Sequence, residues 1–241
     1  MPGFATIIFE KQAQVAYITL NRPQVLNVYN VQMRDDLYQV LGAIRDDSEI
    51  RVVIFTGAGD KAFCAGADLS EFLSAPSPVI ARRVRFGRDL WSLFLNMPQP
   101  LIAACHGFAL GSGLEIALCC DIRIASPDAR FGVPELRLGI LPAAGGTQTL
   151  PRIVGRAKAL EMLLTDRWVA GEEAKEIGLV NMVVPKESLL PTAAEMAHKI
   201  AALNPTAVRL AKQAVLRGLD MPLPQGLILE KTLAEQLKAS K

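Results

Sequence analysis

The sequence predicts an α/β fold, and three observations support this prediction. Short β-branched segments alternate with Gly-rich loops and apolar helical segments. Several of the strand segments are apolar almost throughout, as parallel strands covered on both faces tend to be. Beyond Pro185 the pattern changes to amphipathic helices. We therefore expect residues 1–185 to form the core and residues 186–241 to form a helical C-terminal region.

The composition indicates a folded protein with a large core. The 241-residue chain is 51% apolar, has a mean hydropathy of +0.26 and carries a formal net charge of +2. This apolar content suits one domain, or a domain with a small appendage, and argues against disorder. Acids and bases are interspersed and no apolar run has the length of a membrane span, so we expect neither nucleic acid nor a membrane as a partner.

The cysteines and the first residues predict a reducing compartment. Cys64, Cys105, Cys119 and Cys120 form no Cys-x-x-Cys pair, and three of them lie in apolar runs. We expect buried, reduced thiols rather than a disulfide framework. The start of the chain, MPGFATIIFEK, lacks a basic flank before an apolar run, which a signal peptide would have. A cytoplasmic location is therefore expected.

The predicted strands are β-branched or apolar runs bounded by turn residues. They cover residues 5–10, 14–20, 51–56, 100–105, 121–125 and 179–184. The first two are joined by a tight connection at Lys11–Ala13, and Asn21–Pro23 ends the second. These boundaries predict that each strand leads into a loop or a helix, as the α/β pattern requires.

The predicted helices have apolar residues at helical spacing. Asn30 is expected to cap the first, which runs past Ile44, and Thr147 to cap the segment after the turn at 141–146. The other helices are expected over residues 69–73, 79–97, 114–120, 157–164, 172–177, 189–202, 205–217 and 227–237. In the helix at 79–97, a stripe of arginines is interpreted as solvated or subunit-facing rather than as a phosphate site; these are Arg82, Arg83, Arg85 and Arg88.

A Gly-rich loop, GAGDKAFCAGAD, occupies residues 57–68 after a predicted strand. Its first part, Gly57–Ala62, formally matches the dinucleotide fingerprint. That fingerprint requires a helix to start inside the motif with its N-terminus on the pyrophosphate. Here a second small-residue loop follows, and Asp68 is too close to serve as the ribose acid. We therefore predict a loop in which Ala and Gly let a ligand approach the backbone closely.

The strongest chemical signal is two glutamates near a Gly-rich turn. The turn Gly111–Gly113 opens an apolar helical run that contains Glu115, and Glu135 follows in a turn after Gly132. A carboxylate among apolar residues costs free energy unless it is hydrogen-bonded, and burial favours the protonated form used in proton transfer. Structural roles stay open, because Glu115 can bond to backbone amides and Glu135 can sit at a helix start. Together, the pair predicts one pocket with two carboxylates and backbone N–H donors.

Other catalytic arrangements fit the sequence poorly. Ser112 lacks the flanking glycines of a nucleophile elbow, because Leu110 and Leu114 occupy those positions. The two histidines are His106 and His198, and neither has partners spaced for a catalytic triad or a zinc site. We expect His198 to lie at the surface and the protein to use no metal.

A further set of motifs spans nearly the whole chain. They are Asn21-Arg22-Pro23 with Asn27, FCAGADL at 63–69, GFALGSGLE at 107–115, Asp121, FGVPE at 131–135 and GGTQ at 145–148. Together they resemble the crotonase, or enoyl-CoA hydratase/isomerase, superfamily. The resemblance implies a spiral of ββα units with a helical oligomerisation or lid region, assembled as a homotrimer or a dimer of trimers. It also implies an acyl-CoA thioester substrate, so coenzyme A is part of the substrate and no separate cofactor is expected.

The resemblance also assigns site residues by motif position. The thioester oxygen is expected in an oxyanion hole formed by the backbone N–H groups of Ala67 and Ser112. The second position is often Gly in relatives, and Ser is compatible because the backbone donates the bond. The implied coenzyme A and substrate contacts are Arg22, Val25, Leu26, Ala65, Asp68, Leu69, Gly111, Pro134 and Ala143.

The reaction that the resemblance favours is hydration of a trans-2-enoyl-CoA across its C2–C3 double bond. Negative charge develops on the thioester oxygen, and each fixed N–H donor in comparable sites contributes about 3–4 kcal/mol. Glu135 is expected to give a proton to C2 and Glu115 to orient the water as a base. The alternatives are an enoyl-CoA isomerase, a hydratase for a cyclic or branched acyl-CoA and, in another class, a non-catalytic or RNA-binding homologue.

Three departures from the family pattern bear on the substrate site. Val28 and Tyr29 stand where relatives have smaller or simpler residues, so the pocket entrance is expected to differ. Ala143 stands where Gly is common. The sequence ends at Lys241 where relatives continue, so we expect either a missing segment or a differently built cover over coenzyme A. Residues 69–97 are expected to shape the acyl pocket.

Overall fold

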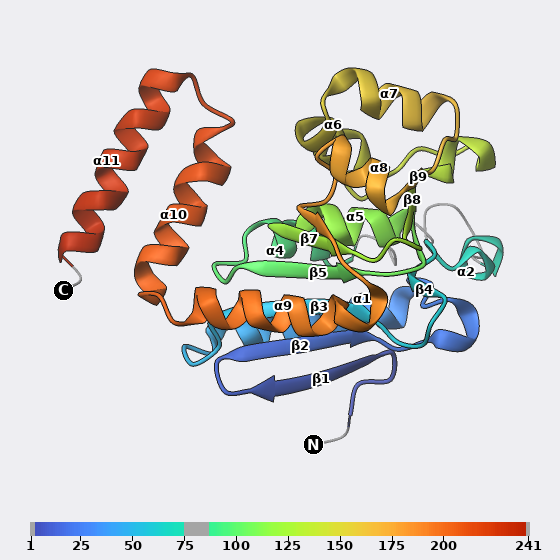
Figure 1. Cartoon of the computed structure of the whole chain (residues 1–241), viewed down its shortest axis with the longest axis horizontal. Coiled ribbons are helices and arrows are strands. Elements are labelled where there is room, and N and C mark those ends of the chain that lie inside the picture. Colours follow the sequence, from blue (N-terminus) through green and yellow to red (C-terminus); the bar gives the residue numbers. More distant parts are fainter. Residues whose placement is uncertain (1–2, 75–86, 240–241) are drawn as a thin grey trace.

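The protein is an α/β structure that ends in a hairpin of two helices (Figure 1). The computed structural model describes residues 3–74 and 87–239. Two sheets of mainly parallel strands form its centre, and helices pack on their faces. The predicted α/β class with a helical C-terminal region is confirmed.

The larger sheet has six strands within the described residues. They are β1 (Ile7–Gln12), β2 (Val15–Leu20), β3 (Val52–Gly57), β5 (Leu101–Cys105), β7 (Ile122–Ala125) and β10 (Met182–Val183). β1 and β2 form an antiparallel hairpin, and its turn places Ala13 at a φ of 51°. From β2 onward the neighbours are parallel, in the order β2-β3-β5-β7-β10. Parallel strands are covered on both faces, which explains why β3 and β5 are apolar almost throughout.

A smaller sheet lies beside the first and was missed by the sequence analysis. Its strands are β4 (Ala62–Cys64), β6 (Phe108–Leu110), β8 (Arg130–Gly132) and β9 (Val169–Ala170), paired in that order. β4, β6 and β8 are parallel, whereas β9 is antiparallel to β8. Runs of two or three residues are too short to show an alternating pattern, so periodicity does not reveal them.

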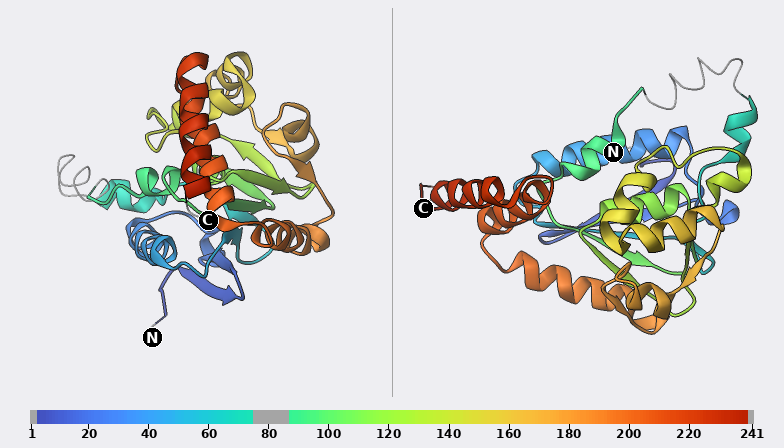
Figure 2. Two further views of the ribbon diagram at one scale, coloured as in Figure 1. Left: turned by 90° about the vertical axis from the view of Figure 1, so that its left-hand side faces the viewer. Right: turned by 90° about the horizontal axis from the view of Figure 1, so that it is seen from above.

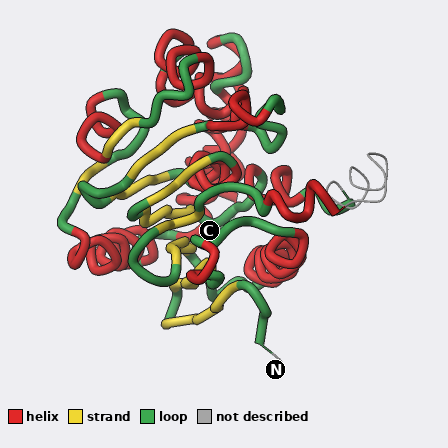
Figure 3. The backbone as a smooth tube through the Cα atoms, turned by 90° about the vertical axis from the view of Figure 1, so that its right-hand side faces the viewer, coloured by secondary structure: helices red, strands yellow, loops and turns green. Residues whose placement is uncertain are grey.

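The chain enters both sheets in each repeat and so builds a spiral of ββα units. β3 leads to β4 and then to α2 (Leu69–Ser74), and β5 leads to β6 and then to α5 (Ser112–Cys119). β7 leads in the same way to β8 and the 3-10 helix η2 (Pro134–Leu138). Figure 3 shows the strands stacked at the centre with helices around them. Corresponding loops of successive repeats therefore come together.

The remaining helices cover the sheets or extend from them. They are η1 (Pro23–Val25), α1 (Val31–Asp46), α4 (Leu90–Leu95), α6 (Gly146–Val154), α7 (Arg156–Leu164), α8 (Gly171–Glu176), α9 (Lys186–Ala201), α10 (Pro205–Gly218) and α11 (Leu223–Ala239). Asn30 caps α1 as predicted, because its Oδ1 accepts a hydrogen bond from Met33 N at 2.9 Å. Leu189 and Ala193 of α9 pack with Val52 and Ile54 of β3. Within the part of the chain described, no helix combines the length and apolar character that a membrane crossing needs.

Two helix predictions are wrong. Within the expected helix at 79–97, residues 87–89 are not helical and α4 begins only at Leu90; residues 75–86 lie outside the described ranges. Asp89 Oδ1 accepts from Ser92 N at 2.9 Å, so this side chain starts a new helix. Thr147 does not cap α6, whose N-cap residue is Gly145 with a φ of 102°. Glycine adopts this left-handed conformation readily, so the helix begins without a hydroxyl cap.

The core confirms the interpretation of the cysteines as buried thiols. Cys64, Cys105, Cys119 and Cys120 are all buried and none forms a disulfide. Burial raises the pKa of the Cys64 thiol to about 11 and that of the Cys105 thiol to about 12. Thiols with such pKa values carry almost no thiolate at neutral pH, so they serve packing rather than chemistry.

The α10–α11 hairpin projects from the body of the protein, as Figures 1 and 2 show. Leu219 and Leu223, at the turn of the hairpin, are 80% and 74% exposed. A polar contact ties α10 to the body: Lys212 Nζ donates to Asp121 Oδ2 at 2.7 Å and to Gln99 O at 2.9 Å. Asp121 directly follows α5 and its cap, so this contact links the hairpin to the central helix of the spiral.

Replacing Lys212 with methionine is expected to loosen the hairpin. Asp121 Oδ2 also accepts from Leu101 N at 2.7 Å, but loss of the ammonium leaves a partly buried carboxylate without its counter-ion. A loss of this kind costs on the order of 1–3 kcal/mol. Hydrogen exchange of α10 and α11 should accelerate and the Tm should fall. The exposed pair Lys199–Glu195 supplies the control, and Lys199→Met should change neither quantity. Unchanged exchange in Lys212→Met would show that the contact is not an anchor.

Candidate active site

The candidate site lies where three loops of the spiral meet. β4, β6 and β8 are parallel neighbours, so their carboxyl ends lie at the same edge of the small sheet. The segments that follow these strands contain Ala67, Ser112 and Glu135 respectively. The fold thus brings together three residues that the motif positions assigned from distant parts of the sequence.

Main-chain hydrogen bonds set the direction of the Ala67 N–H group. Ala67 forms a parallel bridge with Tyr29, in which Tyr29 N donates to Gly66 O and Asp68 N donates to Tyr29 O, both at 2.8 Å. The central residue of such a bridge turns its own N–H and C=O toward the opposite edge. The Ala67 N–H therefore points away from Tyr29. On the other side, a Cβ on Gly66 would lie 3.4 Å from Leu110 O, the end of β6.

The N-terminus of α5 lies directly against the strand that leads to Ala67. A Cβ on Gly113 would come within 2.0 Å of Cys64 O, so only glycine permits this approach. Ser112 is the first residue of α5, where N–H groups have no acceptor within the helix. In the described ranges, neither the Ala67 nor the Ser112 N–H has a hydrogen-bond acceptor. Two such donors on adjacent loops suit an anionic oxygen atom.

Glu115 occupies the first turn of α5 and is 1% exposed. Its Oε1 accepts from Ala144 N at 3.0 Å and from Gly146 N at 2.8 Å. A Cβ on Gly146 would lie 2.9 Å from this oxygen, so the glycine allows the loop to reach the carboxylate. The structure therefore confirms burial and backbone bonding, which the structural role of Glu115 also predicts. Its position beside Ser112 is what favours chemistry.

Glu135 reaches the same helix end from η2. A Cβ on Gly111 would lie 2.6 Å from Glu135 Oε1, and Gly111 has a φ of 48°. The positive φ favours glycine at this position, and the missing Cβ leaves room for the carboxylate. Gly111 N donates to Gly132 O at 2.9 Å, which joins the turn before α5 to the end of β8. Glu115 lies inside the first turn of α5, and Glu135 lies against the residue that precedes this helix. The two carboxylates therefore flank one helix N-terminus.

Six of the nine residues expected to contact coenzyme A lie on two neighbouring segments, 22–26 and 65–69. Ala65 N donates to Leu26 O at 3.0 Å, so the loop around η1 and the segment before α2 are hydrogen-bonded. Val25 and Leu69 are 40% and 47% exposed, which leaves their side chains accessible. Arg22 and Asp68 behave differently, because they bind each other.

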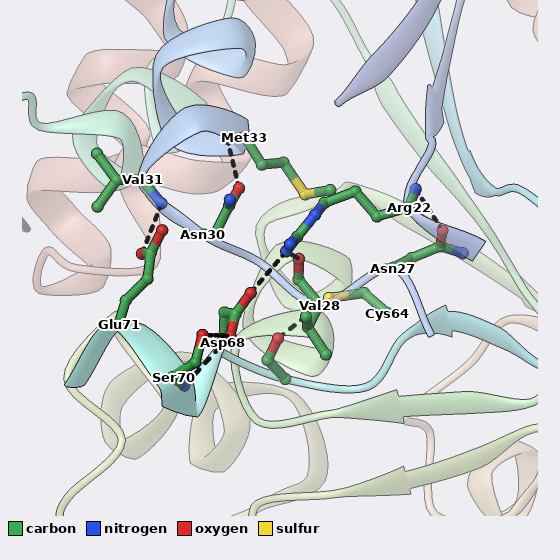
Figure 4. A network of polar contacts seen from close by, with 11 residues as sticks. Arg22, Asn27, Val28, Asn30, Val31, Met33, Cys64, Asp68, Ser70 and Glu71 are labelled. Carbon is green, nitrogen blue, oxygen red and sulfur yellow. Dashed lines mark hydrogen bonds and ion pairs between the residues drawn. The ribbon is translucent and has the colours of Figure 1, made fainter. Parts of the chain in front are cut away.

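Figure 4 shows the Arg22 side chain directed at Asp68 and at the backbone of Val28. Arg22 Nη1 donates to Asp68 Oδ2 at 2.9 Å and to Val28 O at 2.8 Å. The other three expected contacts lie around the carboxylates. Gly111 is buried against Glu135, Pro134 begins η2, and Ala143 is exposed beside the loop that binds Glu115.

A cavity of about 290 Å³ adjoins the loop around η1. Leu26, Asn27 and Lys61 line it together with the loop at 58–60. Asn27 is fully buried and donates to Ala58 O at 2.9 Å, so it holds this wall in place. Sequence reasoning missed Lys61 and this role of Asn27. The available signal was a lysine within a small-residue loop, since an ammonium near a cavity attracts phosphate groups.

The histidines take no part in this arrangement. His106 is buried, its Nε2 donates to Gly59 O at 2.9 Å, and burial followed by the nearby Lys186 ammonium lowers its pKa. His198 is exposed on α9, as predicted. Among the described residues, no three His, Cys, Asp or Glu side chains cluster as a metal site would require. The absence of a metal requirement stays a prediction.

Comparison with known proteins identifies the scaffold. The sequence profile described as enoyl-CoA hydratase/isomerase matches residues 10–241. The chain belongs to the enoyl-CoA hydratase/isomerase family. The resemblance that the motifs indicated is therefore confirmed.

Named members of the enoyl-CoA hydratase/isomerase family resemble this chain over almost its whole length. The short-chain-enoyl-CoA hydratase of Clostridium acetobutylicum is 45% identical, over 93% of this chain and 86% of that protein. The (E)-benzylidenesuccinyl-CoA hydratase of Thauera aromatica is 41% identical, over 94% of this chain and 88% of that protein. The crystal structure of an enoyl-CoA hydratase from Bacillus anthracis has a TM-score of 0.91 and 43% identity, over 95% of this chain and 90% of that chain. These similarities confirm the crotonase-like spiral.

Proposed function

We propose that this family member is an enoyl-CoA hydratase that adds water across the C2–C3 double bond of a trans-2-enoyl-CoA. The observation that carries the proposal is the pair Glu115 and Glu135 at the N-terminus of α5, beside the Ala67 and Ser112 N–H groups. Hydration needs two things at once: a site for negative charge on the thioester oxygen, and groups that handle a water molecule and a proton. This set of residues offers both.

The thioester oxygen is assigned to the Ala67 and Ser112 N–H groups. Charge builds on this oxygen as water attacks C3, and preorganised donors stabilise the enolate without rearrangement. The position of Ser112 at the helix start adds the favourable end of the helix dipole. Because the donors are backbone atoms, the serine side chain does not alter this role.

The two carboxylates are assigned complementary tasks. Glu115, buried and held by the Ala144 and Gly146 N–H groups, orients the water as a base while its oxygen adds to C3. Glu135, partly exposed and placed against Gly111, delivers a proton to C2. The proton that the water loses replaces the proton that Glu135 gives to C2, so both carboxylates end the reaction in their starting protonation states. A water held by both reaches the same face of the double bond, so the expected addition is syn. General acid–base steps of this kind contribute typically about 10²–10⁴-fold.

The coenzyme A part of the substrate is assigned to the loop around η1 and the cavity beside it. The exposed Val25 and Leu69 side chains offer apolar contacts, and Leu26 and Ala65 form the wall between them. Lys61 at the cavity is suited to a phosphate group of coenzyme A. The proposal requires no separate cofactor or metal.

Self-association is part of the proposal. The exposed leucines of the α10–α11 hairpin, among them Leu219, Leu223 and Leu227, suit burial against a second copy. We assign a homotrimer or a dimer of trimers, which light scattering would reveal as three or six chains of 26.1 kDa. A reducing, cytoplasmic compartment fits the four buried thiols.

The test is hydration of crotonyl-CoA, followed as loss of absorbance of the conjugated thioester. Rapid loss with formation of a 3-hydroxyacyl-CoA supports the proposal. Tight binding of acyl-CoA without hydration would instead indicate an isomerase, or a hydratase for a larger substrate. The second outcome would direct assays to branched and aromatic enoyl-CoA compounds, since one relative is named an (E)-benzylidenesuccinyl-CoA hydratase. Failure to bind acyl-CoA would exclude all of these activities.

A further inference from the structure

A polar network beside the candidate active site joins residues 22–31 to residues 65–71. The motif positions implied that Arg22 and Asp68 contact coenzyme A. In the structure both side chains are mostly buried, 18% and 16% exposed, and they form an ion pair at 2.9 Å. Arg22 Nη1 also donates to Val28 O at 2.8 Å. Figure 4 shows this guanidinium pointing into the network.

Both carboxylate oxygens of Asp68 accept hydrogen bonds from within the protein. Its Oδ1 accepts from Ser70 Oγ at 2.6 Å and from Ser70 N at 3.2 Å, while its Oδ2 binds Arg22. The Ser70 hydrogen bond, followed by the contact with Arg22, holds the pKa of Asp68 below its ordinary value. The carboxylate is therefore ionised at neutral pH, and both oxygens are engaged within the protein.

This anchored residue directly follows Ala67. Gly66 O and Asp68 N are fixed by Tyr29, and the Asp68 side chain adds a bond to Arg22. The peptide units before and after Ala67 are thus restrained from both sequence neighbours. The Ala67 N–H can turn only if at least one of these contacts opens.

A second contact reinforces the first one turn later. Glu71 Oε2 accepts from Val31 N at 2.9 Å, at the first residue of α1. Arg22 is itself held, because its N donates to Asn27 Oδ1 at 2.9 Å and Asn27 is fully buried. The network therefore ends at the buried Asn27 and at the N-terminus of α1.

We propose that Arg22 and Asp68 are positioning residues that brace the Ala67 N–H in the orientation required to bind the thioester oxygen. This inference deepens the proposed function and rests on it. It replaces a direct coenzyme A contact by an indirect role. An oxyanion donor acts only when its direction is fixed before the reaction, and a displacement of about 1 Å can cost on the order of 10²-fold in rate.

The brace predicts a specific pattern for Asp68→Asn. The asparagine is nearly the same size but carries no charge to pair with Arg22, which is then left partly buried and unpaired. We expect kcat for crotonyl-CoA to fall by about 10- to 100-fold, with KM and the affinity for free coenzyme A unchanged. Arg22→Met should give the same pattern. The double variant should lose no more than the worse single variant, because both remove one interaction.

The decisive readout is the carbonyl stretch of bound butyryl-CoA, measured by isotope-edited infrared spectroscopy. Butyryl-CoA has no double bond, so it reports on the oxyanion donors without turnover. The stretch should shift to lower wavenumber in the wild type and shift less in Asp68→Asn. Glu173→Gln is the control, because it also removes an arginine–carboxylate ion pair, the more exposed Arg167–Glu173, on the unrelated helix α8. That variant should keep the full shift.

Different results separate this proposal from the proposed function. If the wild type does not hydrate crotonyl-CoA, yet Asp68→Asn reduces the butyryl-CoA shift, the brace stands and the reaction assignment fails. If no acyl-CoA binds, hydrogen exchange of residues 62–70 still tests the brace, and it should be faster in Asp68→Asn than in Glu173→Gln. Should Asp68→Asn fold poorly, Arg22→Lys, which keeps the charge but loses the guanidinium geometry, takes its place. An unchanged shift with unchanged exchange overturns the proposal, as does weaker binding of free coenzyme A with a normal carbonyl shift.

Discussion

Glu135→Gln is expected to reduce kcat for crotonyl-CoA hydration by about 10²–10⁴-fold, the contribution of a positioned acid. Glutamine has nearly the same shape and fits the space against Gly111, where Glu135 Oε1 now lies. It has no proton to give to C2 at neutral pH. Binding of the substrate should therefore persist while the chemical step fails.

Three measurements test this role of Glu135. Hydration should be slow, the Kd for butyryl-CoA should match the wild type, and exchange of the C2 proton of butyryl-CoA with deuterated water should be suppressed. Glu172→Gln, on the exposed surface of α8, is the matched control and should behave as wild type. Full hydration activity in Glu135→Gln would remove Glu135 from the reaction. Suppressed hydration with normal C2 exchange would assign the C2 proton to another group.

The parts of the fold that could be predicted are those specified locally. β3 and β5 are apolar runs long enough to be recognised as buried strands, and Asn30 caps α1 with its own side chain. The strands that were not predicted depend instead on contacts between distant parts of the sequence. β4, β6 and β8 each have three residues, and they exist because they pair with one another across long sequence separations. No local pattern encodes that pairing.

The start of α4 at Leu90 illustrates competition between local signals. Apolar spacing over residues 79–97 favours one helix, but Asp89 accepts a hydrogen bond from Ser92 N and starts a helix at Leu90. The same competition decides α6, where the backbone of Gly145 replaces the expected Thr147 cap. Periodicity indicates that a helix exists, whereas a single capping residue determines where it begins.

At the candidate site, the motifs pointed to the residues, and the structure shows which of them contact one another. Sequence reasoning paired Glu115 with Glu135 because both carboxylates lie beside Gly-rich turns, and the pair is more informative than either residue alone. It did not reveal that Gly111 and Gly146 are the contact points of these carboxylates, since this depends on the missing Cβ atoms. The resemblance implied that Asp68 contacts coenzyme A, and only the folded loop shows that its carboxylate also pairs with Arg22. Assignment of the site residues to catalysis stays a prediction for the experiments above.

Glu115→Gln is expected to lower kcat by about 10²–10⁴-fold while leaving the protein as stable as the wild type or more so. The glutamine Oε1 can still accept from the Ala144 and Gly146 N–H groups, so the loop keeps its anchor. A neutral amide costs less to bury than a carboxylate does, and Glu115 is 1% exposed. Activity and stability should therefore change in opposite directions.

Glu115→Ala provides the contrast that separates chemistry from structure. Alanine removes the acceptor from two buried N–H groups and leaves a cavity, which should lower the free energy of unfolding by on the order of 2–4 kcal/mol. Thermal unfolding and crotonyl-CoA hydration should be measured on both variants. If Glu115→Gln is inactive but stable while Glu115→Ala is inactive and unstable, the charge serves the reaction and the oxygen serves the fold. If Glu115→Gln keeps full activity, the buried carboxylate is only a loop anchor, and the two-carboxylate mechanism fails even though every contact in the structure is preserved.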